Sequence, residues 1–315
     1  MQYRNLGASG LKVSAIGLGT NQFGGKVDFE TSQAIIHTAL DLGVNLIDTA
    51  DVYREGCSEQ FIGKALKGHR SQALIATKVR SKLSRAPNDG GASRQHILNE
   101  VENSLRRLDT DFIDLYQIHS WDSNTPIEET LRALEDLLRS GKVRYIGASN
   151  FSSWQLVWSN ALAELKNWSR FVSIQPHYHM LVRDIEQELL PACRHFNIGV
   201  LPYFPLAGGF LTGKYKRGEP APAGSRGETS QYVQRYMTPQ NFDRLEKLAQ
   251  FAQERDKTLN QLAHAWLLCE PQVSSVISGA TKVEHVQANA SAGDWQLSDE
   301  ERDQVDQILD NDLQT

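Results

Sequence analysis

The sequence predicts an α/β fold of the (β/α)8 barrel class, and three observations support this prediction. Eight short runs rich in β-branched residues recur along the 315-residue chain, segments of helical period separate them, and the runs are mostly apolar throughout. Strands that are buried on both faces and joined by helices form a parallel sheet. Eight such units favour a barrel. An open, doubly wound sheet is the alternative.

The expected strands follow one another along the whole chain. Each run has the length of a strand and is bounded by turn or helix signals. Their sequences and first residues are VSAIGLG from Val13, VNLIDTA from Val44, ALIATKV from Ala73, DFIDLYQIH from Asp111, VRYIGASN from Val143, FVSIQP from Phe171, IGVLPYFPL from Ile198 and VSSVIS from Val273.

Two of the segments between the strands carry clear helix signals. SRQHILNEVENSLRRLD begins with Ser93, whose hydroxyl suits an N-cap. TPIEETLRALEDLLRSGK opens with Thr-Pro, places acids in its first turn and ends on Arg139 just before Gly141. Proline at the start, acids in the first turn, a base in the last turn and a glycine just beyond it are typical of an α-helix.

Two regions interrupt this alternation. Near the N-terminus, YRNLGASGLKV predicts a β-hairpin around a Gly-Ala-Ser-Gly turn, which could close one end of the barrel. After the seventh strand, residues 208–237 are rich in glycine and proline and predict a long loop, a kind of connection that is usually functional or disordered. We expect residues 1–315 to form a single domain, because a barrel of this length is one unit.

Composition narrows the class of partner. The 33 basic and 38 acidic residues give a net charge of −5 without a block of like charge, which argues against a nucleic-acid groove or a membrane-binding basic patch. No secretory signal or membrane span is expected. Three widely separated cysteines, Cys57, Cys193 and Cys269, fit a reducing cytoplasm. A small-molecule substrate is therefore expected, and the oligomeric state stays open.

Four polar side chains stand at or just after the ends of three consecutive expected strands. Asp48 ends the second strand and Tyr53 follows in its loop, Lys78 ends the third strand, and His119 ends the fourth. In a parallel barrel these ends form the active face, and adjacent strands lie about 4.8 Å apart. We expect the four side chains to converge on one patch.

The chemistry of these groups points to proton transfer. A lysine ammonium beside a phenol favours the phenolate, and a carboxylate can keep the lysine charged and oriented. Tyr53 is then a general acid or base, and His119 can hydrogen-bond a substrate oxygen. Hydride transfer from a soluble cofactor fits this set best. A Schiff-base lyase with Lys78 as nucleophile is an alternative.

Six motifs together resemble the aldo-keto reductase superfamily, and more closely the branch shared by bacterial oxidoreductases and the potassium-channel β subunit. They are GVNLIDTADVY, ATKV, LYQIH, GASNF, YFPLAGGFLTGKY and ISGATKVEHVQAN. The resemblance implies reversible, NADPH-dependent reduction of aldehydes or ketones to alcohols. It also implies that Asp48, Tyr53, Lys78 and His119 form the catalytic tetrad. A slowly turning over NADP(H)-binding sensor or regulatory protein is the alternative.

The resemblance also implies which residues hold NADPH or NADP+. The chain departs from the common family pattern at Asn21, where relatives often have Trp, at Phe204, where Ser is common, and at His285, where Gln is frequent. The implied contacts are Thr20, Asn21, Ser149, Asn150, Gln175 and Tyr203 at the nicotinamide end, Phe204, Pro205, Leu206, Ala207, Gly208, Lys214 and Arg226 at the pyrophosphate, and Gly279, Thr281, Lys282, His285 and Asn289 at the adenosine end.

The roles of four other side chains are open. Trp121 and Tyr178 either line the substrate pocket or pack loops. His177 and His179 share one face of a strand, a geometry that some metals use, but no third ligand is evident. No metal site is expected.

Overall fold

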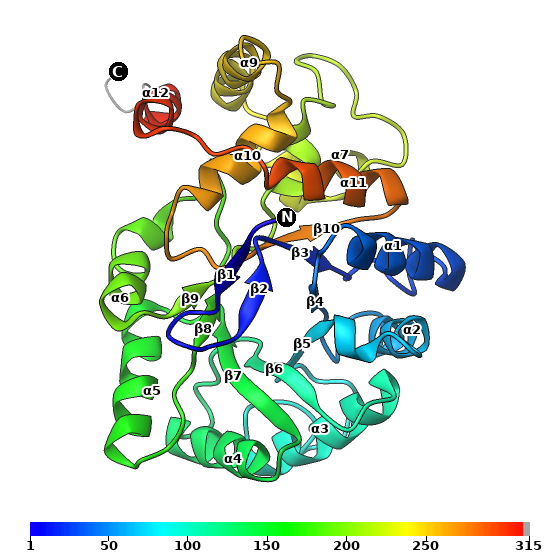
Figure 1. The fold of residues 1–315 in the computed structure, drawn as a ribbon, viewed down its shortest axis with the longest axis vertical. Coiled ribbons are helices and arrows are strands. Elements are labelled where there is room, and N and C mark those ends of the chain that lie inside the picture. Colours follow the sequence, from blue (N-terminus) through cyan, green and yellow to red (C-terminus); the bar gives the residue numbers. More distant parts are fainter. Residues whose placement is uncertain (311–315) are drawn as a thin grey trace.

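A computed structural model describes residues 1–310 of the protein, and its centre is one eight-stranded parallel sheet (Figure 1). The strand order is β10-β3-β4-β5-β6-β7-β8-β9. An α/β fold with a parallel sheet is therefore confirmed. The strands are β3 (Ile16–Gly19), β4 (Leu46–Asp48), β5 (Leu74–Val79), β6 (Ile113–Ile118), β7 (Val143–Ser149), β8 (Ser173–Gln175), β9 (Gly199–Val200) and β10 (Val276–Gly279).

The sheet curls until its two edges meet. Parallel bridges join Val200 to Val273 and Tyr203 to Ile277, and the Ile277 amide donates to the Pro202 carbonyl at 2.9 Å. β9 is short because Pro202 lacks the N–H that a sheet ladder needs. The eight strands thus surround a common interior, and their C-terminal ends share one rim.

Helices cover the outer face of the curled sheet (Figure 1). Two predicted helix boundaries are confirmed: Ser93 Oγ caps α3, and α4 ends at Arg139 before Gly141. Within residues 1–310, no helix is long and apolar enough to cross a membrane. The helices before β9 are α1 (Phe29–Asp41), α2 (Cys57–Ala65), η1 (Arg70–Gln72), α3 (Arg94–Leu108), α4 (Ile127–Arg139), α5 (Ser153–Leu165), η2 (Asp184–Glu186) and α6 (Leu189–Phe196).

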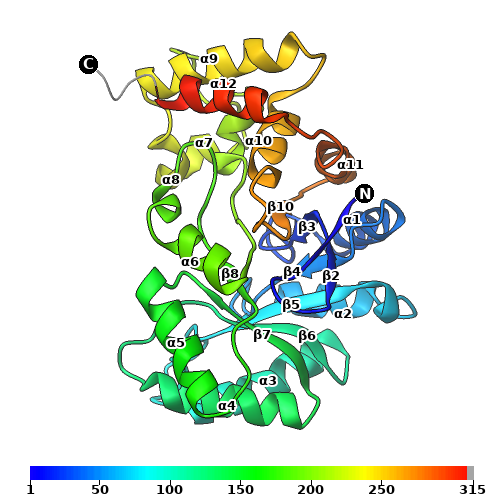
Figure 2. The ribbon, with the colours of Figure 1, turned by 60° about the vertical axis from the view of Figure 1, so that its left-hand side comes forward.

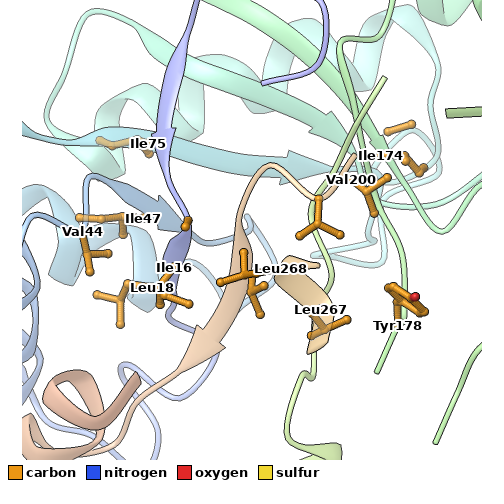
Figure 3. Close-up of a cluster of buried hydrophobic side chains, with 14 of the residues drawn as sticks. Ile16, Leu18, Val44, Ile47, Ile75, Ile174, Tyr178, Val200, Leu267 and Leu268 are labelled. Atoms are coloured by element: carbon orange, nitrogen blue, oxygen red, sulfur yellow. The ribbon is translucent and has the colours of Figure 1, made fainter. Parts of the chain in front are cut away.

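Alternate residues of each strand face opposite sides of the sheet, which gives the protein two apolar layers. Leu46, Ala76 and Leu115 belong to the inner layer. Ile47 and Ile75 belong to the larger outer layer between sheet and helices, part of which Figure 3 shows. The residues two positions after the inner ones therefore also face the interior, at the C-terminal rim.

The predicted hairpin is present. β1 (Tyr3–Asn5) pairs antiparallel with β2 (Lys12–Ser14). The turn packs tightly at Gly7, which has φ 55°, and a Cβ there would lie 2.4 Å from the Val172 carbonyl oxygen. The run that begins at Val13 is divided, because its first residues complete the hairpin and the sheet strand starts only at Ile16.

The connection after β9 contains short helices as well as loop. Residues 208–237 were expected to be one long loop, but η3 (Ala207–Thr212), α7 (Arg226–Thr229) and α8 (Gln231–Gln234) lie in or overlap this segment. Two later helices, α9 and α12, lie side by side (Figure 2). The helices of this last part are α9 (Pro239–Gln253), α10 (Leu259–Leu268), α11 (Val283–Ala292) and α12 (Asp299–Asp310).

Candidate active site

Three of the four expected catalytic side chains meet at the inner rim of β4 and β5. Lys78 Nζ donates to Asp48 Oδ1 and Oδ2 at 2.9 and 2.7 Å, to the Thr49 carbonyl at 2.7 Å and to Tyr53 Oη at 3.5 Å. The lysine is fully buried. Strand alternation explains the meeting, because Asp48 and Lys78 follow inward-facing residues by two positions.

The environment keeps the lysine charged and the phenol neutral. Burial alone would lower the pKa of Lys78, but Asp48 and Tyr53 outweigh it and raise that pKa above its usual value. Burial raises the pKa of Tyr53, and the opposing effect of Lys78 is smaller. The expected preference for phenolate is therefore reversed by burial, and Tyr53 holds the proton that a general acid needs.

His119 lies beside the phenol. Its amide donates to the Val79 carbonyl at 2.9 Å, and its ring meets the Tyr53 ring edge-on with centroids 6.0 Å apart. Burial, followed by the charges of Lys78 and Arg80, lowers the pKa of His119 to about 3. The imidazole is neutral at pH 7, so it can donate a hydrogen bond to an oxygen without taking up a proton.

Two glutamines complete the surroundings of Asp48. Gln175 Nε2 donates to Asp48 Oδ1 at 2.7 Å, and Gln117 Nε2 contacts the same oxygen at 3.4 Å. The contact between Gln117 and Asp48 was not predicted from the sequence. The period of two along a strand could have indicated it, because Gln117 stands two residues before His119, which directly follows β6.

The residues expected around the nicotinamide form one hydrogen-bonded group beside His119. Ser149 Oγ donates to the Gln175 carbonyl at 2.9 Å, and Tyr203 Oη donates to Asn150 Oδ1 at 3.0 Å. Asn150 Nδ2 donates to the His119 carbonyl at 3.0 Å. The strand ends of β6, β7 and β8 and the segment after β9 thus share one polar surface.

Thr20 and Asn21, the two expected cofactor contacts that follow β3, differ in exposure to solvent. Thr20 is almost fully buried, and its hydroxyl donates to the Asp48 carbonyl at 2.8 Å and contacts Ser58 Oγ at 2.9 Å. Asn21, the next residue, is exposed. Thr20 therefore supports the backbone of Asp48, and Asn21 presents its side chain at the rim.

A second cationic region lies at the other end of the expected cofactor path. Burial, followed by the charges of Lys282 and Lys214, lowers the pKa of His285, so three residues from two distant segments lie together. Neither lysine has an ion-pair partner within residues 1–310. Lys282 is the N-cap of α11, and the Thr281 amide donates to His285 Nδ1 at 3.4 Å.

The segment between these two ends has an unusual backbone. Phe204, Ala207 and Gly208 all have positive φ values, 65°, 48° and 68°. The Arg226 guanidinium lies over the Phe204 ring, 5.4 Å from its centroid. Pro205 and Leu206 continue this turn into η3.

Two of the residues expected at the adenosine end lie on later elements. Gly279 ends β10. Asn289 is buried on α11 and accepts from Asn260 Nδ2 at 3.0 Å.

The two aromatic residues with an open role occupy different places. Trp121 lies at the rim and packs edge-on against Phe151, with ring centroids 5.2 Å apart. Tyr178 is buried in the outer layer (Figure 3), where its hydroxyl donates to Glu186 at 2.7 Å and its ring meets Trp266. The position of Tyr178 favours packing over substrate contact.

The histidine pair is held by tyrosines. His177 Nε2 contacts Tyr232 Oη at 2.9 Å, and His179 Nε2 contacts Tyr236 Oη at 3.3 Å. Burial is the main cause that lowers the pKa of His177 to about 4 and that of His179 to about 3. Among the residues that the structure describes, no group of three or more His, Cys, Asp or Glu side chains is arranged to hold a metal.

Comparison with known proteins decides the family. A sequence model of the Aldo/keto reductase family matches residues 15–310. The chain belongs to this family. It is 38% identical over 302 residues to a probable voltage-gated potassium channel subunit beta of Arabidopsis thaliana, with 93% of this chain and 92% of the relative covered. It is also 38% identical to the uncharacterized oxidoreductase YrpG of Bacillus subtilis, with 95% and 93% covered.

A solved structure agrees with this assignment. The aldo-keto reductase AKR11C1 from Bacillus halodurans, in its holo form, matches with a TM-score of 0.79 and 33% identity, covering 98% of this chain and 96% of the other. Family membership makes the protein an aldo-keto reductase type of oxidoreductase with a TIM-barrel-like fold.

Proposed function

We propose that the protein reduces aldehydes or ketones to alcohols with NADPH, reversibly, and that Tyr53 is the general acid. The observation that carries the proposal is the position of Lys78 Nζ, which contacts both Asp48 and the Tyr53 hydroxyl inside a buried rim. A charged lysine that orients a neutral phenol next to a neutral imidazole is a proton-donating arrangement.

Each residue has a separate task in this proposal. Tyr53 donates a proton to the carbonyl oxygen, and His119 hydrogen-bonds the same oxygen and orients it. Lys78 stabilises the phenolate that proton donation leaves, and Asp48 keeps Lys78 charged. When bound, NADPH supplies the hydride that reduces the carbonyl carbon. In the reverse direction the Tyr53 phenolate accepts the proton of the alcohol.

The residues present fit NADPH. The polar group of Ser149, Asn150 and Gln175 would hold the carboxamide, and the Tyr203 ring would lie against the nicotinamide. Lys214 and Lys282 bring two positive charges without ion-pair partners in residues 1–310, which suits the phosphates. These contacts, with Arg226 near the pyrophosphate, remain part of the proposal.

A second candidate is an NADP(H)-binding regulatory protein with slow turnover. The relative named as a probable potassium channel subunit beta supports it. Both candidates use the same cofactor site, and they differ only in the rate of the chemical step. The structure gives the lyase alternative no support, because Lys78 is buried and kept protonated by Asp48, whereas a Schiff-base nucleophile must lose its proton.

One kinetic experiment separates the two candidates. The protein is loaded with NADPH or NADH, mixed with a panel of aldehydes and ketones, and the reduced cofactor is followed by absorbance in single-turnover and steady-state modes. An enzyme oxidises many equivalents of NADPH per chain, and its single turnover is fast. A sensor oxidises about one equivalent slowly. A protein that binds neither cofactor would contradict both candidates.

A further inference from the structure

Arg80 stands at the active rim with a strained backbone. It is the first residue after β5, two positions beyond Lys78, and its φ is 137°. That region of backbone conformation is nearly reserved for glycine, and other residues persist there only where the surrounding structure holds them. The Arg80 carbonyl accepts from the Gly91 amide at 2.8 Å, so the next loop holds this conformation in place.

The guanidinium has unused hydrogen-bonding capacity. Arg80 Nη2 makes one long contact, 3.4 Å to the Trp121 carbonyl, and Nε is buried without a partner. No carboxylate within residues 1–310 forms an ion pair with it. A buried donor without an acceptor is costly, so these donors at a rim of polar residues are available to an acceptor that enters the site.

A carboxylate near Arg80, that of Asp122, is already satisfied. Asp122 accepts from the Ala92 amide at 2.8 Å, from Thr125 Oγ1 at 2.7 Å and from the Asn124 amide at 3.0 Å. Arg80 is close enough to add to the effects that lower the pKa of Asp122, but it makes no direct contact with this carboxylate. The charge of Asp122 therefore partly offsets the charge of Arg80, but Asp122 accepts no hydrogen bond from the guanidinium.

Arg80 lies near the proposed reacting groups and away from the proposed cofactor path. Its charge acts on His119, whose pKa it helps to lower. In the sheet order β5 is separated from β9 by β6, β7 and β8, so the two strands lie on opposite sides of the curl. The pyrophosphate residues follow β9. An anion at Arg80 is therefore not the cofactor's.

We infer that Arg80 binds an anionic group, a carboxylate or a phosphate, carried by the carbonyl substrate. The inference rests on the proposed function, because it places the reacting carbonyl between Tyr53 and His119. The substituent then extends past Trp121 toward the free guanidinium donors. Arginine suits this task because its donors form a fork that matches carboxylate and phosphate oxygens.

Matched substrates test the inference. Succinic semialdehyde is compared with its methyl ester, and glycolaldehyde phosphate with glycolaldehyde, because each pair keeps the aldehyde and changes only the charge. The quantity measured is the ratio of kcat/KM between the charged and the neutral member. We expect a ratio above one in the wild type for at least one pair. Arg80→Gln should lower that ratio about ten- to a hundredfold, the range of one hydrogen bond to a charged group.

Two further variants make the result specific. Arg80→Lys keeps the charge and should retain part of the ratio. Lys82→Gln removes an exposed cation from the same loop and should leave the ratio unchanged. NADPH affinity and the melting temperature of each variant show that the fold is intact.

The outcomes separate this inference from the proposed function. If the wild type reduces neither these pairs nor any aldehyde or ketone of the panel, the proposed carbonyl reduction is contradicted. If it reduces members of the panel but no charged member of a pair, the anion site at Arg80 is overturned. If it reduces both members equally, or if Lys82→Gln lowers the ratio as much as Arg80→Gln, the anion site at Arg80 is overturned. The pair whose ratio falls most on Arg80→Gln identifies the anion as carboxylate or phosphate.

Discussion

Strands β4 to β6 border two buried groups of charged side chains, one on each side of the sheet, and the two groups are organised differently. On the inner side, one ammonium, Lys78, meets one carboxylate, Asp48, and further donors complete the carboxylate. On the outer side, three carboxylates surround a single arginine. We call these the inner cluster (Asp48, Tyr53, Lys78, His119) and the outer cluster (Asp51, Glu59, Glu100, Arg107, Tyr116).

In the outer cluster two carboxylates have hydrogen-bond partners and the third has none within residues 1–310. Glu59 accepts from Thr77 Oγ1 and from Arg107 Nε, each at 2.6 Å, and Arg107 also pairs with Glu100. Asp51 is fully buried, and neither of its carboxylate oxygens has a hydrogen-bond partner within residues 1–310. Burial, followed by the charges of the two glutamates, raises the pKa of Asp51 to about 8.

The difference shows that burial alone does not mark a reactive group. Both clusters contain a phenol whose pKa is raised by burial, the part-buried Tyr53 inside and the fully buried Tyr116 outside. Only Tyr53 has an ammonium in contact with its hydroxyl, and the Tyr116 hydroxyl has no partner within residues 1–310. In the inner cluster the positive charge of Lys78 balances the negative charge of Asp48. Tyr53 and His119 are the groups proposed to hydrogen-bond one substrate oxygen. The outer cluster has a surplus of acid, three carboxylates to one guanidinium, and a proton bound to Asp51 reduces this surplus.

Removing the inner phenol oxygen should give the largest effect. Tyr53→Phe keeps the ring but loses the proposed proton donor, so kcat for carbonyl reduction should fall by about 10²- to 10⁴-fold. The dissociation constant for NADPH should stay within about a few-fold of the wild-type value. Stopped-flow rates and NADPH fluorescence on the same preparation measure the two quantities.

The outer phenol is the matched control for that change. Tyr116→Phe removes the same atom from a buried tyrosine whose hydroxyl has no partner in the described chain, so activity should be retained. The melting temperature should be equal or higher, because a buried unpaired hydroxyl is lost. Equal losses of kcat in the two variants would end the assignment of Tyr53 as general acid.

Breaking the inner ion pair should affect both stability and rate. Lys78→Met leaves Asp48 buried without its counter-charge, and the free energy of unfolding should fall by about 3 to 5 kcal/mol. The double variant Asp48→Asn with Lys78→Met should recover most of that stability but remain inactive. Denaturant unfolding and kcat are measured for both. A double variant that regained wild-type kcat would show that the pair serves folding alone.

Neutralising the outer acid should show in the pH dependence of stability. The pKa of Asp51 is raised in the folded state, to about 8, so the folded protein holds a proton that the unfolded chain releases above about pH 4. Stability is therefore lost as pH rises from about 4 to about 8. Asp51→Asn lacks this loss and should be more stable than the wild type at pH 8 by more than about 1 kcal/mol, since one pKa unit is about 1.4 kcal/mol.

The comparison at two pH values provides the control. At pH 5 the wild type and Asp51→Asn should differ in stability much less than at pH 8, because the loss has only begun just above the unfolded pKa of about 4. Glu219→Gln, which changes an exposed acid, should shift neither curve. A wild-type protein whose stability rises steadily from pH 5 to pH 8 relative to Asp51→Asn would contradict the buried, protonated carboxyl.

The smallest effect is expected where charges are exposed to solvent. Lys282 is exposed and lies near Lys214, so Lys282→Gln should weaken NADPH binding about tenfold or less and leave NADH binding unchanged. The difference should shrink as salt is added, unlike the effects at the buried inner cluster. Isothermal titration at two ionic strengths tests this, and an equal loss for both cofactors would contradict recognition of the 2′-phosphate.

The sequence by itself determined which residues would face each other at the rim. The period of two along a strand places Asp48 beyond Leu46 and Lys78 beyond Ala76 on the inner face, whatever the loops do. Local signals were also sufficient for the hairpin and for the cap at Ser93, because each depends on neighbours only a few residues away.

Only the tertiary structure decided the state of the charges. The bond from Gln175 to Asp48 joins residues 127 positions apart, and the two glutamates whose charges help to raise the pKa of Asp51 come from α2 and α3. The pKa of Tyr53 rises although Lys78 lowers it, because burial by the whole rim is the larger effect. The sequence pattern predicted which groups meet at the rim. It could not predict which of them hold protons, because desolvation and long-range contacts depend on the packed fold.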